Sequence, residues 1–83
     1  MITADDGVPR VRRFTWPPGS VELTARHNFG TDQTAVVVRD PAAGEVDRYG
    51  VEPSPDAPRQ AARLVRTDAD RDRDWVVIIT DLS

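Results

Sequence analysis

Four aspartates stand at alternate positions just before the most apolar stretch of the chain, where their oxygens could in principle hold a cation. They are Asp68, Asp70, Asp72 and Asp74. A calcium loop of the EF-hand type needs oxygen ligands at positions 1, 3 and 5, a glycine at position 6 and a glutamate at position 12. Counted from Asp68, position 6 is Arg73 and position 12 is Ile79. We therefore predict no metal site here, and we interpret the stretch as a solvated turn that opposes edge-to-edge aggregation of the following strand.

Groups that could support catalysis are few. His27 is the only histidine and the chain has no cysteine, so a zinc site of usual composition is excluded. None of the three serines sits in a nucleophile-elbow context, and the five glycines never cluster into a phosphate-binding loop. We predict no catalytic residue and no cofactor, and we interpret His27 as a rim or core residue.

One strand could form a binding site, because it combines arginines with aromatic rings. Arg10, Arg12, Phe14 and Trp16 alternate along it and would share one face, and Arg26 on the wet face of the next strand could extend the set. Such parts suit single-stranded nucleic acid, since bases stack on rings and phosphates pair with guanidinium groups. The alternative is that both rings belong to the core and the arginine stems cover apolar surface at its rim.

Charge and composition argue against several classes of protein. The net charge is −3, so broad binding of nucleic acid is disfavoured. Every basic side chain is arginine and lysine is absent. The N-terminus does not resemble a secretory signal, and the longest apolar run, 75–79, is too short to span a bilayer. We expect a flexible tail at residues 1–8, one small domain at 9–83 and a cytoplasmic location without membrane contact.

Most of the chain shows the two-residue alternation of β-strands. It predicts strands at about 9–16, 20–29, 33–39 and 45–51, the second with Leu23, Ala25, His27 and Phe29 on its buried face. The Asp40-to-Glu45 segment predicts a hairpin loop closed by Gly44 in the left-handed conformation. A four-residue loop would place Val38 opposite Asp47 and Val36 opposite Tyr49.

The last two predicted elements decide between the possible folds and indicate whether the sheet needs a partner. Residues 57–66 fit either a short helix or a fifth strand. The strand at 74–81 is apolar on both faces from Trp75 to Ile79, which is typical of a central strand covered on both sides.

We therefore predict a mainly β fold: a small antiparallel meander of five to six strands, barrel-like or sandwich-like. The alternative is an α+β fold with one short helix at about 57–66 packed on the sheet. For function we expect a non-catalytic protein-interaction or self-assembling module, either a homodimer or bound to a protein partner. The alternative is a small nucleic-acid-binding β-domain that uses the arginine and aromatic strand face.

Overall fold

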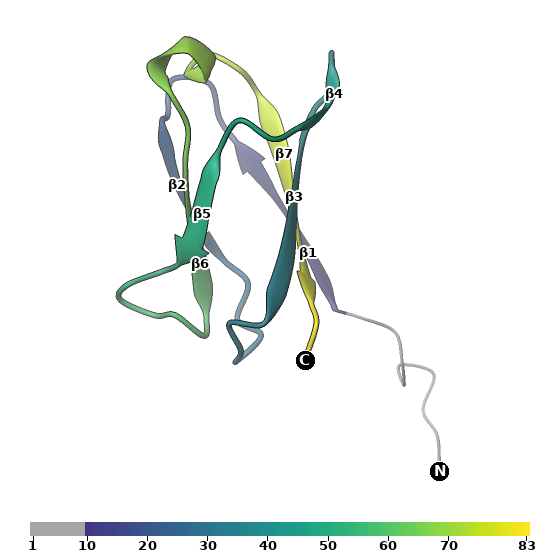
Figure 1. The fold of residues 1–83 in the computed structure, drawn as a ribbon, viewed down its shortest axis with the longest axis vertical. Coiled ribbons are helices and arrows are strands. Elements are labelled where there is room, and N and C mark those ends of the chain that lie inside the picture. The colour runs from purple at the N-terminus through teal and green to yellow at the C-terminus, as the bar shows by residue number, and fades with distance from the viewer. Residues whose placement is uncertain (1–9) are drawn as a thin grey trace.

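The computed structural model describes residues 10–83, so the tail expected at 1–8 lies outside the described residues. Two antiparallel sheets make up the fold (Figure 1). The strands are β1 (Val11–Trp16), β2 (Glu22–Arg26), β3 (Thr34–Asp40), β4 (Gly44–Val46), β5 (Gly50–Pro53), β6 (Ala61–Val65) and β7 (Trp75–Asp81). A 3-10 turn, η1 (Asp68–Asp70), precedes β7. None of the described residues forms an α-helix, and none of their helical segments could cross a membrane.

The prediction of a mainly β, antiparallel fold is confirmed, with seven strands in place of five or six. The helix at 57–66 is wrong, because residues 61–65 form β6 between β2 and β5. The segment contains good helix formers, but pairing on both sides and burial of Ala62 and Leu64 outweigh this local preference.

The simple meander is also wrong. One sheet has the order β1-β7-β3-β4 and the other β2-β6-β5, so β1 pairs with the distant β7 and β2 pairs with β6. Over residues 10–83 the two sheets do not close into a barrel. Consecutive strands pair directly only in the β3–β4 and β5–β6 hairpins, and every other pairing brings together segments far apart in sequence.

The expected strand at 45–51 is divided between the two sheets. β4 ends at Val46 and β5 begins at Gly50, so three residues carry the chain across. The predicted hairpin register is wrong as well, since Val38 pairs with Val46 and not with Asp47. Asp40 pairs with Gly44, so three residues and not four form the loop between them. The left-handed conformation of Gly44 is confirmed, with φ at +93°.

The core fills the space between the two sheets. The four-stranded sheet contributes Trp16, Val38, Val77 and Ile79, among others, and the three-stranded sheet contributes Ala25, Ala62 and Leu64. Trp75 packs edge-on against Trp16 with ring centroids 5.6 Å apart. The prediction that β7 is central is confirmed, because it pairs with both β1 and β3.

Candidate functional site

The arginine and aromatic strand does not present its rings to solvent. Trp16 is fully buried and its indole N–H donates to the Ser20 carbonyl at 3.1 Å. Phe14 is half-buried and packs against the core. A base could stack on Trp16 only if the core opened. Arg26 lies on the outer surface of the other sheet, so the five residues do not form one surface.

Arg10 and Arg12 lie at the rim of the core, over the ring of Phe29. Their guanidinium carbons are 5.0 Å and 5.3 Å from the ring centroid. Arg10 also donates to the Phe29 carbonyl and forms an ion pair with Asp81. These contacts tie the start of β1 to the end of β7 and to the loop after β2.

His27 is buried, with only 2% of its surface exposed, and its ring stacks on Phe29 at 4.8 Å. The backbone N–H of Phe29 donates to Nδ1 at 3.1 Å, so the proton of the neutral ring lies on Nε2. Burial lowers the pKa of His27, an effect that Asp81 opposes and Arg10 reinforces. The imidazole is therefore neutral at pH 7.

The aspartate stretch is not uniformly solvated. Asp70 is buried and receives two hydrogen bonds from Arg48, at 3.0 Å and 3.2 Å, which lower the pKa of its carboxyl group. The solvated-turn interpretation is therefore wrong for Asp70, although Asp68, Asp72 and Asp74 are exposed. Alternation alone could not reveal this, because Arg48 lies 22 positions earlier. Over residues 10–83, no three acidic or histidine side chains gather as metal ligands would.

Arg66 is the most deeply buried charge at this end of the molecule. Its guanidinium carbon lies 4.7 Å from the Trp16 ring centroid and 4.8 Å from that of Trp75. It donates to three backbone carbonyls, those of Pro17, Ser20 and Arg71. Burial lowers the pKa of Arg66, but a guanidinium stays charged in proteins. Arg66 thus joins the β1–β2 loop to the β6–β7 loop, a structural role rather than a site.

Two surfaces remain as candidates, and the first is the outer face of the four-stranded sheet. Alternate residues of β7 enter the core, so Val76 and Ile78 point outward and are only half-buried. Their neighbours Val11 and Val37 are 44% and 37% exposed. We call these four residues the outer apolar face. A hollow of about 360 Å³ crosses it between Arg13 and Arg39.

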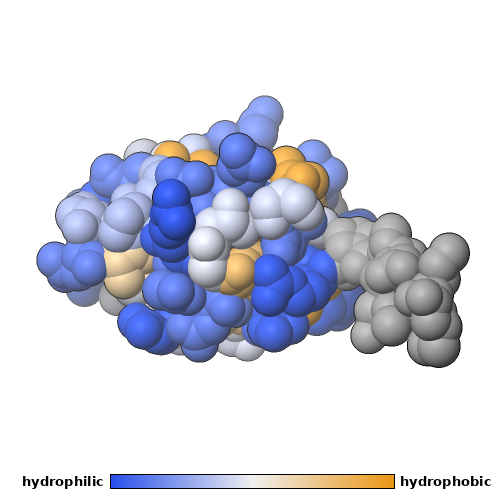
Figure 2. All heavy atoms as spheres, turned by 90° about the horizontal axis from the view of Figure 1, so that it is seen from below, coloured by the Kyte–Doolittle hydropathy of each residue, from blue (hydrophilic) through white to orange (hydrophobic). Residues whose placement is uncertain are grey.

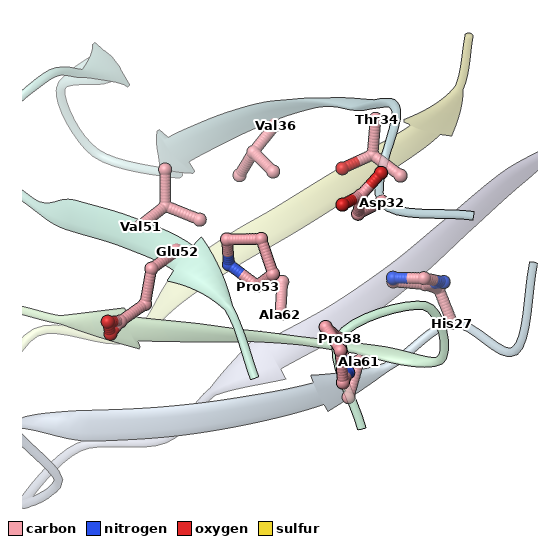
Figure 3. A pocket seen from close by; sticks show the side chains of 10 residues that line it. All are labelled: His27, Asp32, Thr34, Val36, Val51, Glu52, Pro53, Pro58, Ala61 and Ala62. Atoms are coloured by element: carbon pink, nitrogen blue, oxygen red, sulfur yellow. The ribbon is translucent and has the colours of Figure 1, made fainter. Parts of the chain in front are cut away.

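The second surface is a pocket of about 190 Å³ on the side where β3 and β5 face each other across the core. Its floor is apolar, from Val36 on β3 to Val51 and Pro53 on β5 and Ala62 on β6, and His27 lies at one end (Figure 3). Asp32 and Thr34 add oxygens around it, whereas the carboxylate of Glu52 points away toward Arg63 (Figure 3). Seen from one end of the molecule, the surface is mostly hydrophilic and apolar groups emerge in small separate patches (Figure 2).

Sequence reasoning missed this pocket because it depends on the division of the 45–51 segment between two sheets. Only that division brings Val51 and Glu52 opposite Val36. A usable signal was the break in alternation at Asp47 and Arg48, two charged residues in succession inside the expected strand.

Comparisons of the chain with protein-family models, with curated proteins and with solved structures find no match in any of the three.

Proposed function

We propose that this chain is a non-catalytic self-associating module, in which two copies pair through the outer apolar face. The observation that supports the proposal is that β7 is apolar on both sides, while residues 10–83 cover only one of them. Val76 and Ile78 point away from the core, and no element of residues 10–83 crosses over them. Fully burying an exposed side chain of this kind is worth about 1.5–3 kcal/mol; these two are already half-buried, so a second molecule that covers them gains only part of that amount for each.

The charges at the two edges of this face suit pairing with itself, whereas Arg39, which points outward on β3 beside Glu45, lies near the axis in both copies and opposes it. Arg13 lies on β1, at one edge of the sheet, and Glu45 lies on β4, at the other edge. A twofold axis parallel to the strands and between β7 and β3 places β1 of one copy over β4 of the other. The same operation sets Ile78 against Val37, which are register neighbours within one sheet. Twofold pairing needs a self-complementary surface, and this arrangement supplies one.

The register brings the two charges within reach. Arg13 is level with Ile78, and Glu45 is level with Arg39 and Val76, one same-face step further along the strands. That step is about 6.6 Å, which an arginine side chain can span. Each dimer would thus gain two ion pairs at its rim, where such pairs give specificity more than affinity.

The size of the face limits the strength of association. Strands about 4.8 Å apart, each contributing about six residues of ~3.3 Å, give about 400 Å² of flat sheet per copy. The total of about 800 Å² for two copies is below the limit of about 1,000 Å² that specific interfaces usually exceed. We therefore expect a weak, reversible dimer and not an obligate one.

Sedimentation equilibrium over a hundredfold range of protein concentration tests the proposal. The mass should rise from the monomer value of 9.2 kDa toward twice that value. Ile78→Lys should hold the protein at the monomer mass, because it places a charge at the centre of the face. Thr24→Lys, at an exposed position of the three-stranded sheet, is the matched control and should dimerise like the wild type. A constant monomer mass for the wild type defeats the proposal.

A charge exchange tests the twofold geometry. Arg13→Glu alone should weaken the dimer, and Arg13→Glu combined with Glu45→Arg should restore it. If the double variant is as weak as the single one, the two side chains do not meet and the axis is placed wrongly.

Nucleic-acid binding, the alternative considered from the sequence, has weaker support. Trp16 is fully buried, and Arg26 lies on the opposite sheet from Arg10 and Arg12. The chain is also acidic overall, with a net charge of −3.

A further inference from the structure

We propose that the pocket between β3 and β5 binds an extended peptide segment of a partner protein, which adds as a fourth strand beside β5. The segment would insert one apolar side chain into the pocket and carry basic side chains two positions away on the same face. This site is separate from the outer apolar face and does not depend on self-association.

The edge of β5 is open for strand addition. β5 pairs with β6 on one side only, and within residues 10–83 no strand pairs with its other side. The Ser54 N–H donates to the Ala61 carbonyl, so Ser54 faces β6. Along a strand, the backbone N–H and carbonyl of successive residues point to opposite edges. Those of Glu52 therefore point to β6, as those of Ser54 do, and those of Val51 point to the free edge. Pro53 has no N–H to offer, so Val51 is the residue that can form a complete pair.

The opposite wall of the groove is also a partly free edge. β4 covers β3 only from Val38 to Asp40, so within residues 10–83 the segment from Thr34 to Val37 has no strand on that side. The hydroxyl of Tyr49 donates to the Val36 carbonyl at 3.2 Å, so this carbonyl points to the groove and not to β7. The groove is therefore lined by backbone groups on both sides, of which the Val36 carbonyl is already bonded to Tyr49 and the groups of Val51 are free for an added strand.

The direction of the side chains and the size of the pocket are consistent with an added strand in this position. Val51 is opposite Leu64 in the register, so its side chain lies on the inner face of the sheet. A residue paired directly with Val51 would have its side chain on that same inner face. That side chain would enter the pocket of about 190 Å³, which exceeds the 150 Å³ or so that holds a benzene ring, so a leucine fits.

The polar groups select the chemistry of the ligand. His27 is buried, and Nε2 has no hydrogen-bond partner among the described residues, so its N–H is available to a carbonyl of the peptide. The charged side chain at the pocket is acidic: Asp32 forms no ion pair within residues 10–83. Glu52 lines the pocket with its backbone side, while its carboxylate points to the outer face of the sheet, where Arg63 approaches it at 3.5 Å. No arginine lines it, so a basic segment is favoured over an acidic one.

The test is fluorescence anisotropy with the labelled, capped peptide Lys-Thr-Leu-Thr-Lys. Its leucine would pair with Val51, and both lysines would share the leucine's face. Replacing the leucine by alanine should weaken binding about tenfold or more, since three carbons leave an apolar pocket. Replacing both lysines by glutamates should abolish it. Methylating the leucine nitrogen should weaken it about tenfold, because the donor to the Val51 carbonyl is lost.

Variants of the protein test whether the peptide binds in the pocket. Asp32→Lys should lower the affinity severalfold or more, whereas Asp47→Lys, an equal charge change at an exposed position outside the pocket, should leave it nearly unchanged. Equal losses in the two variants would show non-specific attraction and overturn the proposal. The absence of binding at millimolar peptide would also overturn it. Equal affinity for capped leucine alone would overturn it too, because the pocket would then bind a small molecule and not a strand.

Discussion

Arg66 gives the sharpest test of how this small fold holds its two sheets together. It lies between Trp16 and Trp75 and donates to the carbonyls of Pro17, Ser20 and Arg71. We predict that Arg66→Met lowers the free energy of unfolding by about 2 kcal/mol, which is a large share of the total for a domain of this size.

The magnitude follows from opposing effects. Hydrogen bonds from a charged donor contribute about 1.5–3 kcal/mol each, and there are three; the two tryptophan contacts contribute about 0.5–2 kcal/mol each. Against this, burying an ion costs several kcal/mol, and Nη1 of Arg66 is buried without a hydrogen-bond partner in the described chain. Methionine also recovers about 1.5–3 kcal/mol by filling the space. With the middle of each range and about 5 kcal/mol for desolvation, the net loss is about 2 kcal/mol.

Urea unfolding followed by tryptophan fluorescence measures this directly, because both rings flank Arg66. With a slope near 1 kcal/mol per molar urea, the midpoint should fall by about 2 M. Arg66→Lys should not restore stability, since a single ammonium group cannot reach three carbonyls in the way a planar guanidinium can. The control is Arg59→Met, an exposed arginine, which should change stability by less than about 0.5 kcal/mol.

Two results would refute this reasoning. An Arg66→Met variant as stable as the wild type would mean that desolvation cancels all the contacts. An Arg66→Lys variant equal to the wild type would mean that charge alone matters and that the three-carbonyl geometry does not.

Three further predictions concern turns and carboxylates. Gly44→Val should cost about 1–2 kcal/mol in urea unfolding because φ is +93° there, and an unchanged midpoint would show that the turn relaxes. Asp70→Asn should lower the melting temperature measurably while Asp72→Asn leaves it unchanged, because only Asp70 is buried and paired; equal effects would contradict this. The hydrogen bonds from Ser83 lower the pKa of Asp81 to about 2, below its ordinary value of 3.8, so its contribution to stability is present above pH 4 and lost as the pH falls toward 2. An Asp81→Asn variant should therefore show a weaker loss of stability between pH 4 and pH 2, and an identical pH profile would exclude this role.

The strands that alternate strictly could be predicted from the sequence, because alternation reports directly which side chains face the core. Leu23, Ala25, His27 and Phe29 do point inward, and β7 is central as its doubly apolar pattern indicates. Gly44 was also predictable, since few residues other than glycine tolerate its backbone conformation.

Pairing between distant strands could not be predicted from one sequence. The preference of Gln60-Ala61-Ala62-Arg63-Leu64 for a helix is local, whereas the strand it forms is fixed by β2 and β5 on either side. The role of the arginine and aromatic strand could not be predicted for the same reason. Arginines beside aromatic residues have one meaning on an open face and another at the rim of a core, and only the partner sheet decides between them.

The two proposed surfaces meet at β3, and the geometry of a strand explains why they should act independently. Val37 points outward to the outer apolar face, while Val36, its neighbour, points inward to the pocket. A strand separates such neighbours onto opposite faces of a sheet, and pairing with β7 holds β3 in register. Binding a peptide beside β5 therefore leaves the outer face unchanged. Peptide affinity should be the same in Ile78→Lys as in the wild type, and dimer affinity the same in Asp32→Lys. A difference in either would mean that β3 moves, and that the two sites are coupled through it.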